Sequence, residues 1–404
     1  MKKDRLIYIA SVVVCVALLV LGYFAVSFSD DFYASDDGTL YIRADVEQII
    51  ESSFSDSGEG DTVFWARISS GEKKGELVRV YQNRSDYTVF NPREVQEGDS
   101  IIIALFEGVE NWHFIDFVRS DAIVVLLLVF ALLLIVFGRK KGLKTVLSLF
   151  LTIASVLFVF IPAVLGGGNI YFWAVTICIY IIFMTLLITD GLSPMSLAAA
   201  IGCTGGVFAS LIVTFFADLS LKLTGNAEPN SVYLISIGNG LDLKALIYAS
   251  IIIGSVGAVM DVAVDISASL KELAIKLKNP GMRELFSSGI NIGRDVIGTM
   301  SNTLVLAYIG GSLGSLLLYS YNNWKSPIYL FNVEIIIVEI LKIIVGSIGI
   351  LLTLPLTALV SSFIYTRRGM KKRFLTENVD AANEDEYSIL LENAGTFEAE
   401  NKDI

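Results

Sequence analysis

The chain has few of the residues that proteins use for acid–base catalysis, metal binding or covalent cross-linking. Its 404 residues include one histidine, three cysteines and seven prolines, and only 18% are charged. The cysteines (Cys15, Cys178 and Cys203) all lie in apolar segments, which indicates buried thiols rather than a disulfide framework or a zinc site. The single histidine, His113, cannot build a metal site by itself. We therefore expect no metal, no cofactor and no enzymatic activity.

Positive charge is also scarce. The formal net charge is −11, and most of the acidic excess lies in residues 29–121 and after Phe374. A nucleic-acid partner would need a basic surface. This class of partner is excluded.

Apolar residues are abundant, at 54% of the chain with a mean hydropathy of +0.66. They fall in blocks of about the 17–25 residues that cross a bilayer as a helix. Helices are expected there because unpaired backbone groups are costly in lipid. The pattern predicts a polytopic α-helical membrane protein with about eight spans, in direct contact with the lipid bilayer. The blocks are 6–26, 122–137, 145–165, 170–189, 195–216, 244–270, 299–319 and 333–365.

The first block has two interpretations. A cleaved signal peptide is one, but the apolar run is longer than a usual signal core and no A-x-A site follows it. We favour a retained membrane anchor over residues 1–28.

Residues 29–121 form the one long polar stretch, and they lie between spans 1 and 2. Short alternating or β-branched runs in this stretch are separated by turn residues. They predict about five strands in a small β-barrel or sandwich, of which the oligonucleotide-binding fold is one type. The fold type implies no nucleic-acid binding here, because the surface of this stretch is acidic. The predicted strands are 40–50, 62–69, 76–82, 100–106 and 112–118.

Orientation follows from lysine and arginine, which crowd on one side of the alternating spans. The rule predicts that both termini are cytoplasmic and that residues 29–121 are outside. Residues 122–366 would then form a seven-span domain. Residues 367–404 would form a tail that is first basic and then acidic, and that is largely disordered.

Spans three to five and six to eight enter the membrane from opposite sides, as an inverted repeat requires, although the supporting similarity is slight. The interior of the spans is rich in glycine, which we expect to permit close contacts between helices. These glycines are at positions 202, 205, 206, 254, 257, 310, 311, 314, 346 and 349.

Charged residues within apolar blocks need an explanation, because a charge in hydrocarbon costs a few kcal/mol or more. Asp261 and Asp265 are four residues apart, so a helix places both on one face. They could share a proton or hold a cation. Alternatively, Asp265 lies among headgroups and Asp261 pairs with a basic residue.

Downstream, Arg294, Asp295 and Asn302 belong to a strip of charged, hydroxyl and amide residues with interspersed glycines. Arg294 could neutralise one of the aspartates, and the strip could line a hydrated path. The alternative is a packing seam of small and polar residues. Glu339 and Lys342 are three apart in the last block, and we expect them to pair with each other.

Several motifs together resemble the YibE/F family of bacterial membrane proteins. They are Gly257-Ala-Val-Met-Asp261-Val-Ala, Gly293-Arg-Asp295-Val-Ile-Gly298-Thr-Met-Ser-Asn302, Glu339-Ile-Leu-Lys-Ile-Ile-Val-Gly346, Pro355-Leu-Thr-Ala358 and Gly138-Arg-Lys-Lys-Gly142. The resemblance covers about residues 115–365. It implies a multi-span protein of the bacterial plasma membrane, with a shorter paralogous membrane protein as a candidate partner. It implies no particular activity.

The sequence leaves two functional hypotheses of different classes. The first is a transport-associated protein, a permease or permease subunit, that responds to protons or cations at Asp261. The second is a non-transporting scaffold or sensor whose outer domain binds an envelope component. An enzyme within the membrane is a third alternative, which the single histidine disfavours.

Overall fold

The computed structural model describes ten ranges of the chain: 2–27, 40–54, 60–71, 73–84, 93–106, 108–109, 111–225, 241–277, 280–323 and 326–367. The predicted tail lies outside these ranges from residue 368 onward, as do residues 29–39. The chain divides into two compact units, which are Asp30–Gly142 and the combination of Met1–Ser29 with Leu143–Ile404. Each unit is described by itself, and the four-part division predicted above stays a prediction.

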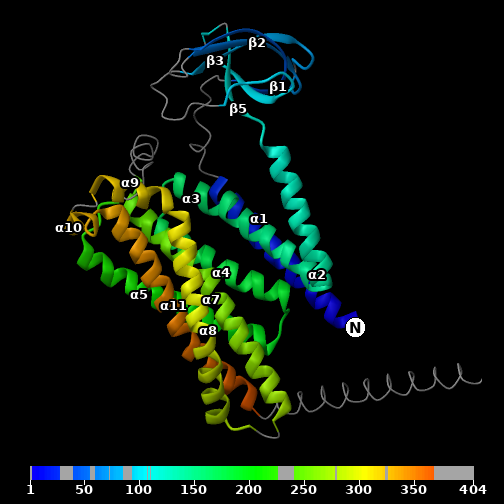
Figure 1. The fold of residues 1–404 in the computed structure, drawn as a ribbon. Coiled ribbons are helices and arrows are strands. Elements are labelled where there is room, and N and C mark those ends of the chain that lie inside the picture. Colours follow the sequence, from blue (N-terminus) through cyan, green and yellow to red (C-terminus); the bar gives the residue numbers. More distant parts are fainter. Residues whose placement is uncertain are drawn as a thin grey trace, which may run out of the picture. The chain divides into compact units, whose positions relative to one another are not determined.

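The strands of the first unit form a closed barrel in the order β1-β2-β3-β5-β4 (Figure 1). Neighbouring strands pair antiparallel except β3 and β5, which pair parallel. This five-stranded order is that of an oligonucleotide-binding type barrel. The predicted small barrel is therefore confirmed. Its strands are β1 (Leu40–Phe54), β2 (Gly60–Ile68), β3 (Leu77–Arg84), β4 (Ser100–Leu105) and β5 (Trp112–Phe117).

The barrel interior is filled by alternate residues of its strands, because successive side chains of a strand point to opposite faces. Phe64 in β2 and Ile101 and Ile103 in β4 are fully buried. Two buried side chains of the strands are polar, Thr62 and Gln82. The Gln82 amide donates to the Arg93 carbonyl at 2.9 Å and accepts from the Val95 N–H at 3.2 Å. Gln82 thereby holds the segment before β4 against β3.

Ion pairs lie on the barrel surface. Arg67 binds the Glu47 carboxylate, and the Arg119 guanidinium lies 2.7 Å from Asp116. The hydrogen bond that Arg119 donates to Asp116 holds the pKa of the Asp116 carboxyl below its usual value. Both pairs are well exposed, so they contribute little to stability.

Helices make up the rest of the described chain. Five of them are long and apolar enough to cross a membrane, or six if the bent pair α8–α9 is one span. The helical segments are α1 (Lys2–Ser27), α2 (Ser120–Ser155), the π-helix Val156–Phe160, α3 (Ile161–Leu165), α4 (Ile170–Thr189), α5 (Pro194–Leu221), α7 (Leu243–Lys276), α8 (Met282–Gly311), α9 (Leu313–Asn323), α10 (Pro327–Leu330) and α11 (Glu334–Thr366).

Side-chain caps fix the start of three membrane-length helices. Asn169 accepts a hydrogen bond from the Phe172 N–H at the start of α4, and Ser193 accepts one from Ser196 at the start of α5. Asp242 caps α7 by accepting from the Ala245 N–H at 3.0 Å. Each cap satisfies a backbone donor that has no partner within its own helix.

Helix α2 is two helices joined at Arg139, whose φ of 49° is not helical. A Cβ atom at Gly142 would lie 1.9 Å from the Leu134 carbonyl oxygen, so the chain folds back closely over this turn. Only a residue without a side chain fits there. The predicted blocks 122–137 and 145–165 are thus separate helical segments.

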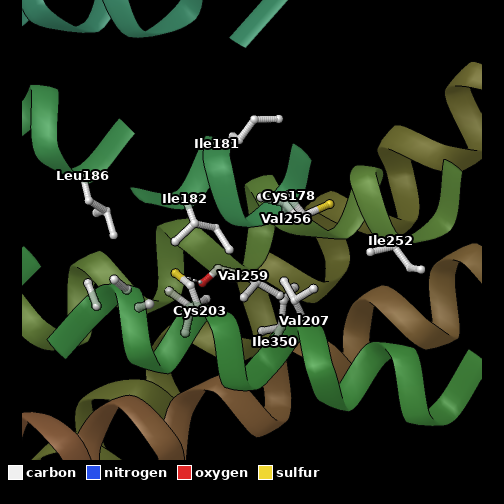
Figure 2. Packing of buried hydrophobic residues seen from close by; sticks show 14 of the residues in the cluster. Cys178, Ile181, Ile182, Leu186, Cys203, Val207, Ile252, Val256, Val259 and Ile350 are labelled. Carbon is white, nitrogen blue, oxygen red and sulfur yellow. Dashed lines mark hydrogen bonds between the residues drawn. The ribbon is translucent and has the colours of Figure 1, made fainter. Parts of the chain in front are cut away.

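The core of the helical unit is formed by α4, α5, α7 and α11. Figure 2 shows Cys178 beside Val256, with Cys203 close to Val259. The Cys203 thiol lies 3.9 Å from the Val259 carbonyl. All three cysteines are buried and free, which confirms their interpretation as buried thiols.

Glycines let α5 approach α11 closely. A Cβ atom would lie 1.9 Å from Thr357 Oγ1 at Gly202, and 1.8 Å from Thr353 Oγ1 at Gly206. Close approach of this kind maximises van der Waals contact, which matters because lipid provides no hydrophobic driving force between helices. Four of the glycines predicted to make such contacts (Gly257, Gly310, Gly311 and Gly314) instead have no described atom within 4 Å of a built Cβ.

The predicted seventh span, residues 299–319, is not one straight helix. Helix α8 begins seventeen residues earlier, at Met282, and it is bent by 65° from the segment Leu313–Tyr321. The Ser312 N–H bonds the Tyr308 carbonyl at 3.0 Å and ends α8. Gly310 and Gly311 immediately precede the break, and glycine lowers helix propensity by about 1 kcal/mol per residue.

Candidate functional site

Helix α7 carries a continuous row of small and acidic residues on its exposed side. Ser250, Gly254, Gly257, Asp261 and Asp265 are all exposed, and they follow one another at intervals of three or four residues. This spacing places them on one face of the helix. None of the large hydrophobic side chains exposed on the described chain belongs to α7. We call these five residues the α7 row.

The two carboxylates of the row lie one helical turn apart. Within the described residues, neither Asp261 nor Asp265 forms an ion pair or a hydrogen bond through its side chain. The basic partner considered in the sequence is therefore not found in the described structure. Two exposed acids without a local partner are available to bind a cation, a proton or a group on another molecule.

Helix α8 has a matching polar face. Asn291, Arg294, Asp295, Gly298 and Asn302 are exposed at helical spacing, and we call them the α8 row. The opposite face of α8 is apolar or small and is buried. The local sequence dictates this division, since apolar and polar residues recur with the period of a helix.

Small residues on the buried face bring α8 onto its neighbours. A Cβ atom at Gly289 would lie 2.9 Å from Leu270 Cδ1 of α7, and one at Gly293 would lie 2.3 Å from Leu354 Cδ1 of α11. A Cβ atom at Gly254 would lie 2.5 Å from the Tyr308 hydroxyl. These contacts fix the register of α8.

The register places the two rows at the same depth. Helices α7 and α8 are antiparallel, and Gly254 is level with Tyr308 while Leu270 is level with Gly289. Because both helices rise equally per residue, Asp265 is level with residues 294–297 and Asp261 with residues 298–301. Arg294 and Asp295 therefore lie at the same depth as Asp265 along the helix axes, although neither forms an ion pair with it in the described structure.

Glu339 and Lys342 pair as the sequence indicated. The Lys342 ammonium donates to Glu339 Oε1 at 2.9 Å, and the two side chains are 13% and 17% exposed, respectively. The second carboxylate oxygen of Glu339 is buried and has no hydrogen-bond partner in the described structure. The contacts Gly293–Leu354 and Leu304–Gly346 place Tyr308 level with this pair. The pair is a packing element of the bundle.

A second polar cluster was not predicted from the sequence. Asp218 at the end of α5 pairs with Lys244 at 2.5 Å and accepts a hydrogen bond from the Tyr248 hydroxyl at 2.7 Å. Lys244 and Tyr248 are four residues apart in α7, and this spacing could have indicated a shared partner. The cluster ties the end of α5 to the start of α7.

Glu334, the first residue of α11, acts at the same end of the bundle. Its carboxylate accepts from the Thr224 N–H at 2.9 Å, from the Thr224 hydroxyl at 2.6 Å and from the Gly225 N–H at 2.7 Å. Glu334 thus caps the chain that leaves α5. Hydrogen bonds to an ionised group are among the stronger ones in proteins.

No group of three or more histidine, cysteine, aspartate or glutamate residues with the geometry for a metal ion occurs among the described residues. A cavity of about 380 Å³ lies where α4 leads into α5, and it contains none of the predicted site residues. Its lining is almost wholly apolar. The candidate site is therefore the pair of polar rows on α7 and α8.

The apolar helices, the buried small-residue seams and the barrel together define a polytopic helical membrane protein that carries a small β-barrel. The family model described as YibE/F-like protein matches residues 126–367. The chain belongs to this YibE/F-like family. No curated protein and no solved structure matches the chain.

Proposed function

We infer that the protein is transport-associated, as a permease or permease subunit, and that it responds to protons or cations at Asp261. The single observation that carries this proposal is the α7 row. It exposes two carboxylates and three small residues on a helix whose other described faces are packed, with no large apolar side chain exposed.

The depth of Asp261 supports this function. Lys244 is in the ion pair at the end of the bundle, and Asp261 lies 17 residues further along α7. At a rise of about 1.5 Å per residue, the two are about 26 Å apart along the axis, against a hydrocarbon thickness of about 30 Å. With Lys244 at one headgroup surface, Asp261 is inside the hydrocarbon and Asp265 is at its far boundary.

A carboxylate at that depth is unstable against lipid tails. Ionisable residues within membranes therefore face water-filled cavities or other polar groups, and they mark ion and proton paths. The α8 row lies at the same height and offers amide, carboxylate and guanidinium groups beside the α7 row. These two rows would form the walls of a hydrated path, with Asp261 as its titrating group.

The proposal includes eight crossings with both termini in the cytoplasm, the barrel outside and the bacterial plasma membrane as location. Helix α1 is apolar over its described part Tyr8–Phe24, and α2 consists of two helices that fold back at Gly142. The eight crossings are α1, the first part of α2, the second part of α2 continued to Leu165, α4, α5, α7, the bent pair α8–α9, and α11. The lysine and arginine asymmetry supports the orientation.

Proton flux in proteoliposomes tests the proposed function. Vesicles with entrapped pyranine are given a potassium diffusion potential with valinomycin, and the internal pH is followed. We expect the wild-type protein to acidify the lumen, and Asp261→Asn to reduce the rate at least tenfold. Glu272→Gln, an exposed acid beyond the α7 row, is the matched control and should keep the rate. Equal rates for wild type and Asp261→Asn would rule out the role of Asp261.

Solvent access to the two rows supplies a second readout. The probe position is Thr299, which is exposed next to Gly298 of the α8 row. In a background with the three native cysteines replaced by alanine, Thr299→Cys should react with a water-soluble methanethiosulfonate reagent. Phe208→Cys, on the exposed apolar face of α5, should not react. No reaction at position 299 would show that the rows are dry and would contradict the hydrated path.

The barrel supports a second candidate function, as a scaffold or sensor for an envelope component. Aromatic and basic side chains gather where β3 meets β5: Phe106 lies 5.8 Å from His113 between ring centroids, and Arg79 lies over Tyr81 at 5.3 Å. Such surfaces suit ligands with apolar and anionic parts. Deleting residues 29–121 should abolish pull-down of an envelope component if this function holds, and should leave proton flux in place if the first one does.

A further inference from the structure

We propose that α7 and α8 pair with the same two helices of a second copy of this chain, so that the α7 and α8 rows of the two copies face each other within the membrane. The proposal rests on the proposed function only in placing these rows inside the bilayer. It does not require that the protein conduct ions.

The distribution of exposed apolar side chains singles out this face. Helix α5 exposes Phe208, Ile212 and Phe215, and α11 exposes Leu351 and Leu352, among others. These helices have the surface expected of lipid contact. The described part of α7 exposes no large apolar side chain, and α8 exposes only Met282, Leu306 and Ile309. Lipid tails are a poor solvent for the polar groups exposed here, so another polar surface must cover this face.

Glycines give an independent indication of the same face. Those between packed helices, such as Gly202 and Gly293, lie where a Cβ atom would meet the next helix at less than 2.5 Å. Gly257 in the α7 row and Gly298 in the α8 row have no described atom within 4 Å of that position. Glycine in membrane helices serves close helix contact. These two positions have room for a helix that the described part of this chain does not supply.

Charge complementarity favours a second copy as the occupant. The α7 row carries two acids, Asp261 and Asp265, whereas the α8 row carries both Arg294 and Asp295. Arg294 lies at the depth of Asp265 and is the basic group that can face it. A two-fold axis along the membrane normal keeps depth unchanged and sets α7 of one copy opposite α8 of the other. Asp265 then faces Arg294 of the second copy, and the reverse contact forms at the symmetric position. Such an isologous surface pairs with itself.

Cross-linking in native membranes tests the pairing. In the background without native cysteines, Gly257→Cys and Gly298→Cys are each treated with a short bismaleimide. We expect a covalent dimer of this chain in both cases, identified by co-expressing two tags of different size. Phe208→Cys on the lipid-facing side of α5 is the matched control and should remain monomeric. Equal yields at all three positions would indicate random collision and would overturn the proposal.

Charge reversal tests the complementarity. Photobleaching steps of fluorophore-labelled protein in nanodiscs should count two copies for the wild type and mostly one for Arg294→Asp. Combining Arg294→Asp with Asp265→Arg should restore two. Monodisperse elution in detergent shows that each variant is folded. One copy for the folded wild type, or pairing only with a shorter family member, would overturn the proposal. Proton flux is not part of either readout, so this proposal can fail while the proposed function stands.

Discussion

At the scale of single residues, small side chains and hydroxyls shape the helical core. Thr353 and Thr357 of α11 lie against glycines of α5, and the buried Thr353 hydroxyl donates to the Gly349 carbonyl of its own helix at 2.7 Å. A hydroxyl that bonds its own helix is already satisfied and does not need a partner across the interface. At Gly206 the tight fit therefore depends on volume rather than on a hydrogen bond from Thr353 to α5.

Gly206→Ala should destabilise the helical unit, because the added methyl group would lie 1.8 Å from Thr353 Oγ1. Overpacking of this kind costs about 1–3 kcal/mol. The thermal unfolding midpoint of the detergent-solubilised protein should fall by several degrees. Gly314→Ala in α9 is the matched control, since no described atom lies within 4 Å of the added methyl group and alanine has the higher helix propensity. An unchanged midpoint for Gly206→Ala would contradict the close contact of α5 with α11.

Charged residues at this scale have two different environments. Glu339 and Lys342 neutralise each other locally, because a separation of three residues lets a helix bring them together. Asp261 and Asp265 have no such neighbour in the described structure, and both are exposed. The first pair stabilises packing, and the second pair is available for chemistry.

At the scale of elements, the helices share an apolar face toward the core, but their exposed faces differ in polarity from helix to helix. Helices α5 and α11 expose phenylalanine, leucine and isoleucine, whereas α7 and α8 expose the two polar rows. This contrast separates a lipid-facing surface from one that another polar surface covers. The turn within α2 is a further element-level feature, because it changes one apparent helix into two.

Gly142→Ala should disrupt the turn of α2. The added methyl group would lie 1.9 Å from the Leu134 carbonyl oxygen, a backbone atom that cannot rotate away. We expect a loss of about 3 kcal/mol or a failure to fold, measured as a lower yield of monodisperse protein and a lower unfolding midpoint. Gly138→Ala is the matched control, because no described atom lies within 4 Å of its built Cβ. Similar behaviour of the two variants would show that the chain does not fold back at this turn.

At the scale of the whole molecule, the chain consists of a β-barrel, whose surface suits water, and a helical unit, whose surface suits lipid. The barrel buries its apolar residues inside and exposes ion pairs such as Arg67–Glu47. The helical unit exposes many large apolar side chains, as only a lipid-facing surface can do at little cost. The proposed topology places the barrel outside and connects it along the chain to the proposed spans α1 and α2.

Cysteine labelling of intact cells tests this topology. Glu76→Cys, exposed on the barrel, should react with a membrane-impermeant maleimide when added from outside. Lys140→Cys, exposed in the turn of α2, should react only after the cells are opened. The native cysteines are buried and provide a low background. Labelling of position 140 but not 76 from outside would reverse the proposed orientation.

Local patterns in the sequence predict most of the strands and helices of this protein. Alternation over a few residues places the five strands within a few positions of those observed, and the apolar run 170–189 coincides with α4. The pairing of Glu339 with Lys342 also followed from spacing alone. These features depend on neighbours within a few residues, so local periodicity is enough to predict them. The family was likewise evident from motifs in the sequence.

Contacts between residues far apart along the chain became evident from the folded structure alone. Asp218 binds Lys244 and Tyr248, and Glu334 binds Thr224, more than a hundred positions away. It also decided that Gly206 is enclosed while Gly257 is open, although both are glycines within apolar helices. Such contacts depend on the rotation and register of packed helices. The rotation and register of each helix follow from how side-chain volumes fit along its whole length. The local spacing of residues in a single sequence does not give that fit.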